Sequence, residues 1–302
     1  MPSIRECITE YEWGDIILVV SVLIGDAYRA LPEEVKPRRS RGSPPEFTDV
    51  EVLTVVFLCE YLFGGNEKIT LAFLNNYHRD MFPKLLERTR FNRRRRMLFE
   101  AIEALRQFFT ELQGMADDPH RVADSLPITQ CGWRRRHRCA LMQGQLWQGY
   151  VAAKKQHFFG LRLHLTTNVL GLVDRWMLAP ASLDERAVIP HLTTDDQPRV
   201  FLADRGYVDA DLEANLNIDC GHQLLALRRS NQKLQWDPSL RHIVTTLRRW
   251  VETAGSVLDS VFNIEHPNAK TGSGLLTRIA SKLFAYNFAF VLVAVLVFTF
   301  NY

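Results

Sequence analysis

The first third of the chain has the hydrophobic spacing of helices. The segment DIILVVSVLIGDAYRAL, from Asp15 to Leu31, is largely apolar and is followed by Pro32, which predicts a helix that stops there. Residues 36–47, KPRRSRGSPPEF, are too rich in Pro, Gly and Arg for a helix and predict a loop.

A second helix is predicted to begin at Thr48, because Glu51 three residues later completes the sequence of a capping box. Shorter helical segments follow to about Leu98. Residues 95–115, RRMLFEAIEALRQFFTELQGM, then predict one long amphipathic helix. We therefore expect residues 1–115 to form an all-helical region.

From residue 116 onward the pattern changes to strands and then to alternating strands and helices. Residues 158–181 alternate as a hairpin does, with Leu161, Leu163 and Leu165 on one side and Arg162 and His164 on the other. Further elements are predicted in the order helix 184–192, strand 200–204, helix from 209, strand 223–228 and helix 240–262. This order predicts an α/β fold with a mixed sheet flanked by helices, over residues 116–302.

Two of these strands lead into carboxylates. Val122 and Ala123 run into Asp124, and the strand 200–203 runs into Asp204, so we expect both acids at strand ends. Functional groups gather at the carboxyl ends of strands in open α/β sheets. Two carboxylates that meet there repel each other unless a cation lies between them, and oxygen-only ligands favour Mg²⁺ or Mn²⁺.

Glu252 is the candidate for a third carboxylate. It lies at the margin of the apolar face of the predicted helix 240–262, and Arg248 and Arg249 precede it by three or four residues, where they could hold a phosphate. Each acid has an ordinary alternative, since an Asp after a strand is commonly a turn residue or helix cap and a helical Glu is commonly solvated. Two metal ions held by such a set can support phosphodiester cleavage and transfer.

The overall composition says little about function, whereas the distribution of charge along the chain is informative. The chain has 302 residues, is 47% hydrophobic and 24% charged, and has a formal net charge of +3. Three arginine-rich blocks lie at residues 36–42, 88–96 and 133–139, and such blocks suit either a phosphate backbone or a solvated surface.

Two other features leave alternatives open. Cys131, His137 and Cys139 suggest a zinc site, but the sequence has no matching second set of zinc ligands. The cysteines are expected to be reduced thiols in a cytoplasmic protein. The segment from Leu283 to the C-terminus is apolar and about long enough to cross a bilayer, but we favour a buried terminal helix or strand over a membrane anchor.

Several quoted segments together resemble a known family. DSLPI, DRGY and RRWVET, in this order, with FTDVEVLTVVFL, RTRFNRRRRML, AAKKQHFFGLRLHL and LLALRRSNQK, are similar to DDE-type transposases of bacterial insertion sequences, particularly the insertion sequence 982 group. The resemblance covers roughly residues 45–285. Thr245 and Asp259 stand where some relatives have Tyr and Lys.

This resemblance implies a fold, a chemistry and a partner. It implies an RNase H-like (retroviral integrase-like) core in residues 116–302, with Asp124, Asp204 and Glu252 as catalytic, metal-binding residues for Mg²⁺ or Mn²⁺. It also implies a helical DNA-binding region, residues 1–115, that recognises terminal inverted repeats. The expected activity is end cleavage and strand transfer into target DNA by a homodimer or higher oligomer, in the cytoplasm and on the nucleoid, without stable membrane association.

Basic residues near these elements are candidate contacts to double-stranded DNA. They are Arg93, Arg94, Arg95, Arg96, Lys155, His157, Arg228, Arg229, Lys233, Arg248 and Arg249. The alternative for Lys155 and His157 is that their side chains are simply solvated and contact no DNA. Two other functions are compatible with parts of the chain: a catalytically inactive, transposase-derived DNA-binding protein, and a membrane-anchored helical protein.

Overall fold

The structure, a computed structural model, describes residues 12–38, 43–152, 154–193, 197–228 and 235–300. Internal contacts divide the chain into two compact units. Unit 1 comprises residues 1–113, 261–263 and 269–302, and unit 2 comprises residues 114–260 and 264–268. The last helix is therefore grouped with the N-terminal helices, and the predicted functional division between residues 115 and 116 stays a prediction.

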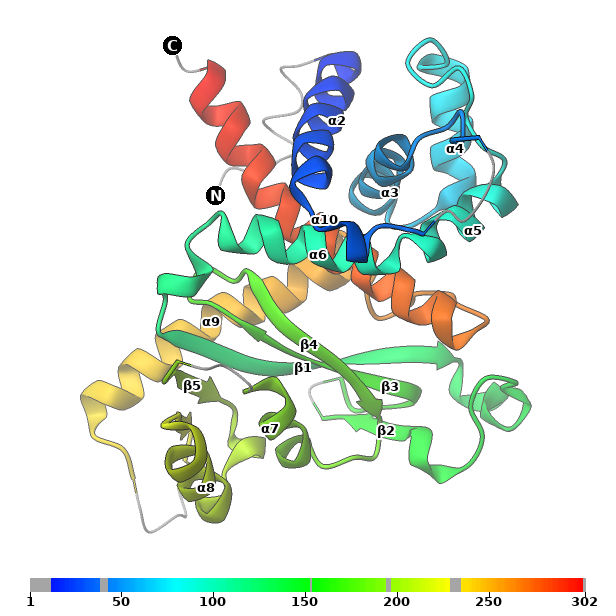
Figure 1. The fold of residues 1–302 in the computed structure, drawn as a ribbon. Coiled ribbons are helices and arrows are strands. Elements are labelled where there is room, and N and C mark those ends of the chain that lie inside the picture. The colour runs from blue at the N-terminus through cyan, green and yellow to red at the C-terminus, as the bar shows by residue number, and fades with distance from the viewer. Residues whose placement is uncertain (1–11, 39–42, 153, 194–196, 229–234, 301–302) are drawn as a thin grey trace. The chain divides into compact units, whose positions relative to one another are not determined.

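Unit 1 is built from helices in its described part (Figure 1). The capping box predicted at Thr48 is confirmed: the Glu51 backbone N–H donates to the Thr48 hydroxyl at 3.2 Å, and the Thr48 N–H donates to the Glu51 carboxylate at 2.7 Å. The helices are α2 (Trp13–Ala30), α3 (Asp49–Phe63), α4 (Glu67–Tyr77), α5 (Arg88–Met97), α6 (Phe99–Glu111) and α10 (Gly272–Phe300), with a short 3-10 helix η1 (Glu33–Val35) after α2.

The predicted single helix over residues 95–115 was wrong at one point. Leu98, with φ −93° and ψ 13°, separates α5 from α6. The backbone changes direction there while Leu98 itself stays fully buried. A bend of this kind keeps the apolar spacing on both sides, so periodicity does not reveal it.

Helix α10 supplies much of the core of unit 1. Phe288 is fully buried and packs with ring centroids 4.9 Å from Phe57 and 4.6 Å from Phe109. By length and composition, residues Gly272–Leu296 could cross a membrane, yet 78% of their most apolar window is buried. Core helices of this composition bury their whole circumference against neighbouring helices.

Unit 2 contains a six-stranded mixed sheet, as the α/β patterning predicts (Figure 1). Strand β3 pairs antiparallel with β1, with β4 and with the short strand β2. Strand β5 pairs parallel with β1 and with β6. The strands are β1 (His120–Cys131), β2 (Gln148–Val151), β3 (Gln156–Thr167), β4 (Val173–Pro180), β5 (Val200–Ala203) and β6 (Gln223–Ala226).

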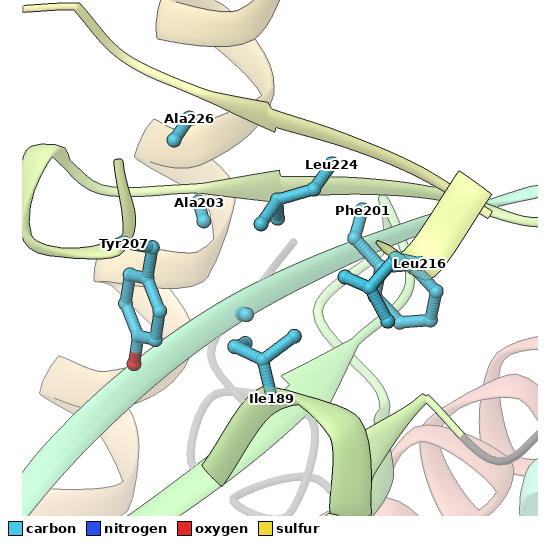
Figure 2. Packing of buried hydrophobic residues seen from close by; sticks show 8 residues of the cluster. Ile189, Phe201, Ala203, Tyr207, Leu216, Leu224 and Ala226 are labelled. Carbon is cyan, nitrogen blue, oxygen red and sulfur yellow. The ribbon is translucent and has the colours of Figure 1, made fainter. Parts of the chain in front are cut away.

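Helices cover both faces of this sheet, and each face has its own buried cluster. Phe201 and Ala203 of β5 pack with Ala123, Tyr207 and Leu216 on one face, which Figure 2 shows from close by. Leu202, which points the other way, packs with Val122 and with Val244 of α9. The helices of unit 2 are α7 (Ile189–Leu192), α8 (Ala210–Cys220) and α9 (Pro238–Ser260), and the 3-10 helices are η2 (Met115–Asp117), η3 (Trp133–Arg138), η4 (Gln145–Trp147), η5 (Glu185–Val188) and η6 (Arg205–Tyr207).

The position predicted for Asp124 at the end of a short strand was wrong. Strand β1 continues for seven residues beyond Asp124, because Ser125 to Ile128 pair with β3 from Leu161 to His164. Asp124 therefore lies inside the sheet. Asp204, in contrast, directly follows β5 as predicted and caps η6.

Candidate functional site

Asp124 and Asp204 lie at the same level of two neighbouring strands. β1 and β5 are parallel, and Val122 is the partner of Leu202 in their register. Both acids follow these partners by two residues. Since side chains alternate along a strand, Asp124 projects on the same face as Val122, and Asp204 on the same face as Leu202.

Helix α9 packs on this same face and carries the third predicted acid. Val244 contacts the cluster of Val122 and Leu202, and a Cβ added to Gly255 would lie 3.2 Å from a methyl carbon of Leu126. The helix therefore runs along β1 past Asp124. Glu252 is exposed and lies three residues before Gly255, about 60° around the helix.

The backbone orients both aspartates locally. The N–H of Ser125 donates to the Asp124 carboxylate at 2.8 Å, and the N–H of Arg205 donates to the Asp204 carboxylate. Both acids are half-buried, so they remain reachable from solvent.

A polar network lies on the opposite face, directly behind Asp124. The Ser125 hydroxyl donates to Glu185 at 2.8 Å and accepts from Arg162 at 3.2 Å, while Arg162 and Glu185 form an ion pair at 3.1 Å. The Tyr207 ring is 1% exposed, and burial, followed by the negative charges of Glu185 and Asp124, raises its pKa. Tyr207 therefore stays protonated at neutral pH.

The donor set suits a hard cation, but the three acids do not form a closed cage. Within the described ranges, no group of three His, Cys, Asp or Glu side chains is close enough to hold a metal ion. Asp124 and Asp204, with Glu252 on the helix that packs against their face, nevertheless carry the oxygen ligands that Mg²⁺ and Mn²⁺ prefer.

The arginines of α5, predicted to bind DNA, have different environments. Arg93 and Arg96 are exposed, whereas Arg94 donates to the Phe47 carbonyl and pairs with Asp49 at 2.6 Å. The prediction for Arg95 needs correction: its side chain is 1% exposed and pairs with Glu60 and Glu67. It is part of the buried core of unit 1 and does not present its guanidinium to DNA.

The predicted contacts of unit 2 also divide into groups. Lys155, His157 and Arg249 are exposed. Arg228 is nearly buried, with a side chain 7% exposed that pairs with Glu213 at 2.6 Å and lies over the Trp236 ring. Its charge is therefore compensated within unit 2. Arg229 and Lys233 lie outside the described residues, as does the side chain of Arg248.

Comparison with known proteins identifies the family. The profile of a family described as transposase DDE domain matches residues 116–271, just over half of the chain. The chain belongs to the DDE transposases. No curated protein and no solved structure matches the transposase.

The sequence interpretation missed the network behind Asp124 in this transposase. Arg162 was assigned only to one side of a strand. Asp184 and Glu185 were expected to begin a helix and favour its dipole, with metal binding as the lesser alternative; Asp184 does cap η5. Ser125 and Glu185 are sixty residues apart, and no local pattern links them. Tyr207 had a weak signal, because it belongs to the DRGY segment that carries Asp204.

Proposed function

We propose that the transposase cuts DNA at the ends of an insertion sequence and joins the freed ends to target DNA, with Asp124, Asp204 and Glu252 as its catalytic residues. The observation that carries this proposal is the placement of Asp124 and Asp204 at one level of adjacent parallel strands, on the face that α9 covers. The family match supports the same chemistry.

The order of the strands supports an RNase H-like core. Three antiparallel strands, β4, β3 and β1, are followed in the sheet by two strands parallel to β1. A relationship to the insertion sequence 982 group remains part of the proposal and rests on the segments around Asp124, Asp204 and Glu252.

The proposed cofactor is Mg²⁺ or Mn²⁺, held by the three carboxylates. When bound, two such cations activate an attacking oxygen and stabilise the leaving oxygen of a phosphodiester. The chain itself supplies negative charge at fixed positions, since Ser125 and Arg205 orient the two aspartates through their backbone N–H groups.

Two successive displacements account for transposition. Water forms a bond to the scissile phosphorus and the bond to the 3′ oxygen breaks, which leaves a 3′-hydroxyl on the element. That hydroxyl then attacks a phosphorus of target DNA and displaces the 3′ oxygen there. The nucleophiles are water and DNA, so no covalent bond to the protein forms.

The helical region of residues 1–115 is proposed to bind the terminal inverted repeats. Arg93 and Arg96 of α5 are exposed and suited to phosphate contacts. Pairing of two ends requires at least a dimer, and the expected location is the cytoplasm, on the nucleoid.

The decisive experiment measures end cleavage of a supercoiled donor plasmid in magnesium chloride. Asp124→Asn, Asp204→Asn and Glu252→Gln should each reduce cleavage by about 100-fold or more, since each removes a metal ligand. Binding to inverted-repeat DNA should persist. The exposed Asp219 of α8 provides the control, and Asp219→Asn should cut normally.

Two outcomes would contradict the proposal. Normal cleavage by any of the three variants removes that residue from the catalytic set. A wild-type protein that binds inverted repeats but never cuts them, with either Mg²⁺ or Mn²⁺, would instead be a DNA-binding protein without turnover.

A further inference from the structure

A long segment of unit 2 contains cations but no acid. Between Asp124 and Asp174 the sequence has no Asp or Glu, whereas it has seven Lys and Arg residues. Four of these arginines belong to η3, which connects β1 to the turn before β2. Lys154 and Arg162 pair with Glu265 and Glu185 from other segments, so the local positive charge comes mainly from the arginines of η3. Such a charge attracts a polyanion.

The arginines of η3 have two different roles. Arg136 lies over the Trp133 ring, 4.5 Å from its centroid, and donates to the Trp133 carbonyl at 3.1 Å. Arg134, Arg135 and Arg138 are exposed. Among the residues that the structure describes, no acidic side chain pairs with these three, so their charge faces solvent.

Aromatic contacts attach η3 to the sheet. The ring of His157 in β3 lies 5.1 Å from Trp133 and 4.9 Å from Tyr150, its partner in β2. Lys155, in the turn between these strands, is exposed and has a φ of +48°. We call η3 together with Lys155 the basic loop.

The aromatic anchor of the basic loop lies on the same face of the sheet as Asp124. Asp124 pairs with Leu165 across β1 and β3, and His157 lies eight residues before Leu165 on the same strand. An even separation places both side chains on one face. Helix α9 packs on this face between Val122 and Leu126, so a duplex would reach the carboxylates from the side of α9 and meet the basic loop farther along β1.

We propose that the basic loop binds the phosphate backbone of duplex DNA beside the cleavage site. This inference rests on the proposed function and adds the position of the contact. Asp124 and Cys131 are seven positions apart with a bulge between Thr129 and Cys131, so the strand between them spans about 20 Å. That length corresponds to roughly six base pairs of duplex DNA, so the contacted phosphates should lie about six base pairs from the cut.

The test uses duplexes that carry an inverted-repeat end and one neutral methylphosphonate, moved one position at a time away from the cut. The full-length wild-type protein should bind about three- to tenfold more weakly when the neutral linkage lies roughly six base pairs from the cut. The variant Arg134→Ala/Arg135→Ala/Arg138→Ala should be insensitive at those positions. Its affinity should also fall less steeply with salt, by about two to three in the slope of log K against log salt.

Two control variants separate a local contact from loss of charge or structure. Arg241→Ala/Lys270→Ala removes positive charge from exposed positions outside both the basic loop and residues 1–115, and should keep the wild-type response to the neutral linkages. The second control replaces Arg134, Arg135 and Arg138 by lysine, which keeps the positive charge and should restore most of the binding. Unchanged thermal unfolding of each variant checks the fold.

The outcomes distinguish this inference from the proposed function. If the alanine variant responds to the neutral linkages as the wild type does, the basic loop does not contact those phosphates, while cleavage that depends on Asp124 still stands. If the wild-type protein binds DNA but responds to no linkage near six base pairs, the assigned position is wrong. Wild-type protein that neither binds nor cuts the duplex would overturn both.

Discussion

At the scale of single residues, His164 shows how a strand can hold a polar side chain without a partner. It is fully buried opposite Ser125, and neither ring nitrogen has a hydrogen-bond partner within the described part of the chain. Burial, followed by the positive charge of Arg162, lowers the pKa of His164 from 6.5 to about 4. The imidazole is therefore neutral in the folded protein at neutral pH.

This shift predicts a loss of stability in acid. The unfolded chain binds a proton at His164 below pH 6.5, whereas the folded chain resists it until about pH 4. His164 therefore has no effect on the free energy of unfolding above pH 6.5. As the pH falls to 4, it lowers that free energy by about 3 kcal/mol. Urea unfolding across this range should show a smaller pH dependence for His164→Leu than for the wild type.

A second histidine gives the control for this measurement. His242 of α9 is exposed, and His242→Leu should leave the pH dependence unchanged. Equal pH dependence of the wild type and His164→Leu would mean that His164 is protonated as easily in the folded state as in the unfolded chain.

The run Arg93 to Arg96 shows the limit of sequence at this scale. Four identical residues follow one another, yet one is buried in ion pairs, one is half-buried and paired with Asp49, and two are exposed. A helix turns about 100° per residue, so consecutive residues face different surroundings. Their environments depend on Glu60 and Asp49, which lie on another helix.

At the scale of elements, the pairing of β1 with β3 depends on a close backbone contact. A Cβ added to Gly160 would lie 2.0 Å from the Ile128 carbonyl oxygen and 2.9 Å from the Gln130 nitrogen. The register of the two strands shifts at this point, between Thr129 and Cys131. Glycine is needed because backbone atoms, unlike a flexible side chain, cannot move aside locally.

Gly160→Ala should therefore destabilise the protein by about 2 kcal/mol or more, since the strands must separate to fit the methyl group. Equilibrium unfolding in urea measures this cost. Gly132→Ala is the matched control, because a Cβ there meets nothing within 4 Å and its φ is −58°. Equal stability of the two variants would show that the strands do not approach so closely at Gly160.

Most helices and strands were predictable from the sequence, and the errors fall where contacts with distant segments determine the backbone conformation. The hairpin of β3 and β4, the Thr48 cap and helix α9 follow from periodicity and turn residues. The length of β1 was underestimated because Ser125, Pro127 and Thr129 break the apolar pattern. Their strand conformation comes from pairing with β3, which is remote in sequence.

At the scale of the whole molecule, the C-terminal helix completes a unit that begins at the other end of the chain. Lys282 and Arg95 both pair with the fully buried Glu60, with Lys282 at 2.6 Å. Burial disfavours ionisation of Glu60, but the two cations outweigh it and lower its pKa. Arg95 of α5 already pairs with Glu60, and Lys282 of α10 adds a second buried cation to the same carboxylate.

The packing of α10 can be tested by comparing two apolar residues of this helix. Phe288→Ala should destabilise unit 1 by about 3–5 kcal/mol, because it leaves a cavity beside Phe57 and Phe109. Leu276 is 41% exposed, and Leu276→Ala should cost about 0.5 kcal/mol or less. Thermal and urea unfolding of purified protein without detergent would measure both.

A helix that left the unit to enter a bilayer would give a different result. Phe288→Ala would then change the stability of the detergent-free protein no more than Leu276→Ala does. Such equality would reject the core role of α10.

The sequence by itself determined the elements and the order of the three acids, because helix and strand patterns arise from hydrogen bonds and side-chain spacing within short segments. Only the tertiary structure decided that Asp124 lies inside a strand level with Asp204, that Ser125 pairs with Glu185, and that α10 belongs with α3 and α6. These relations depend on packing between segments tens to hundreds of residues apart. The free energy of burial selects such packing for the molecule as a whole.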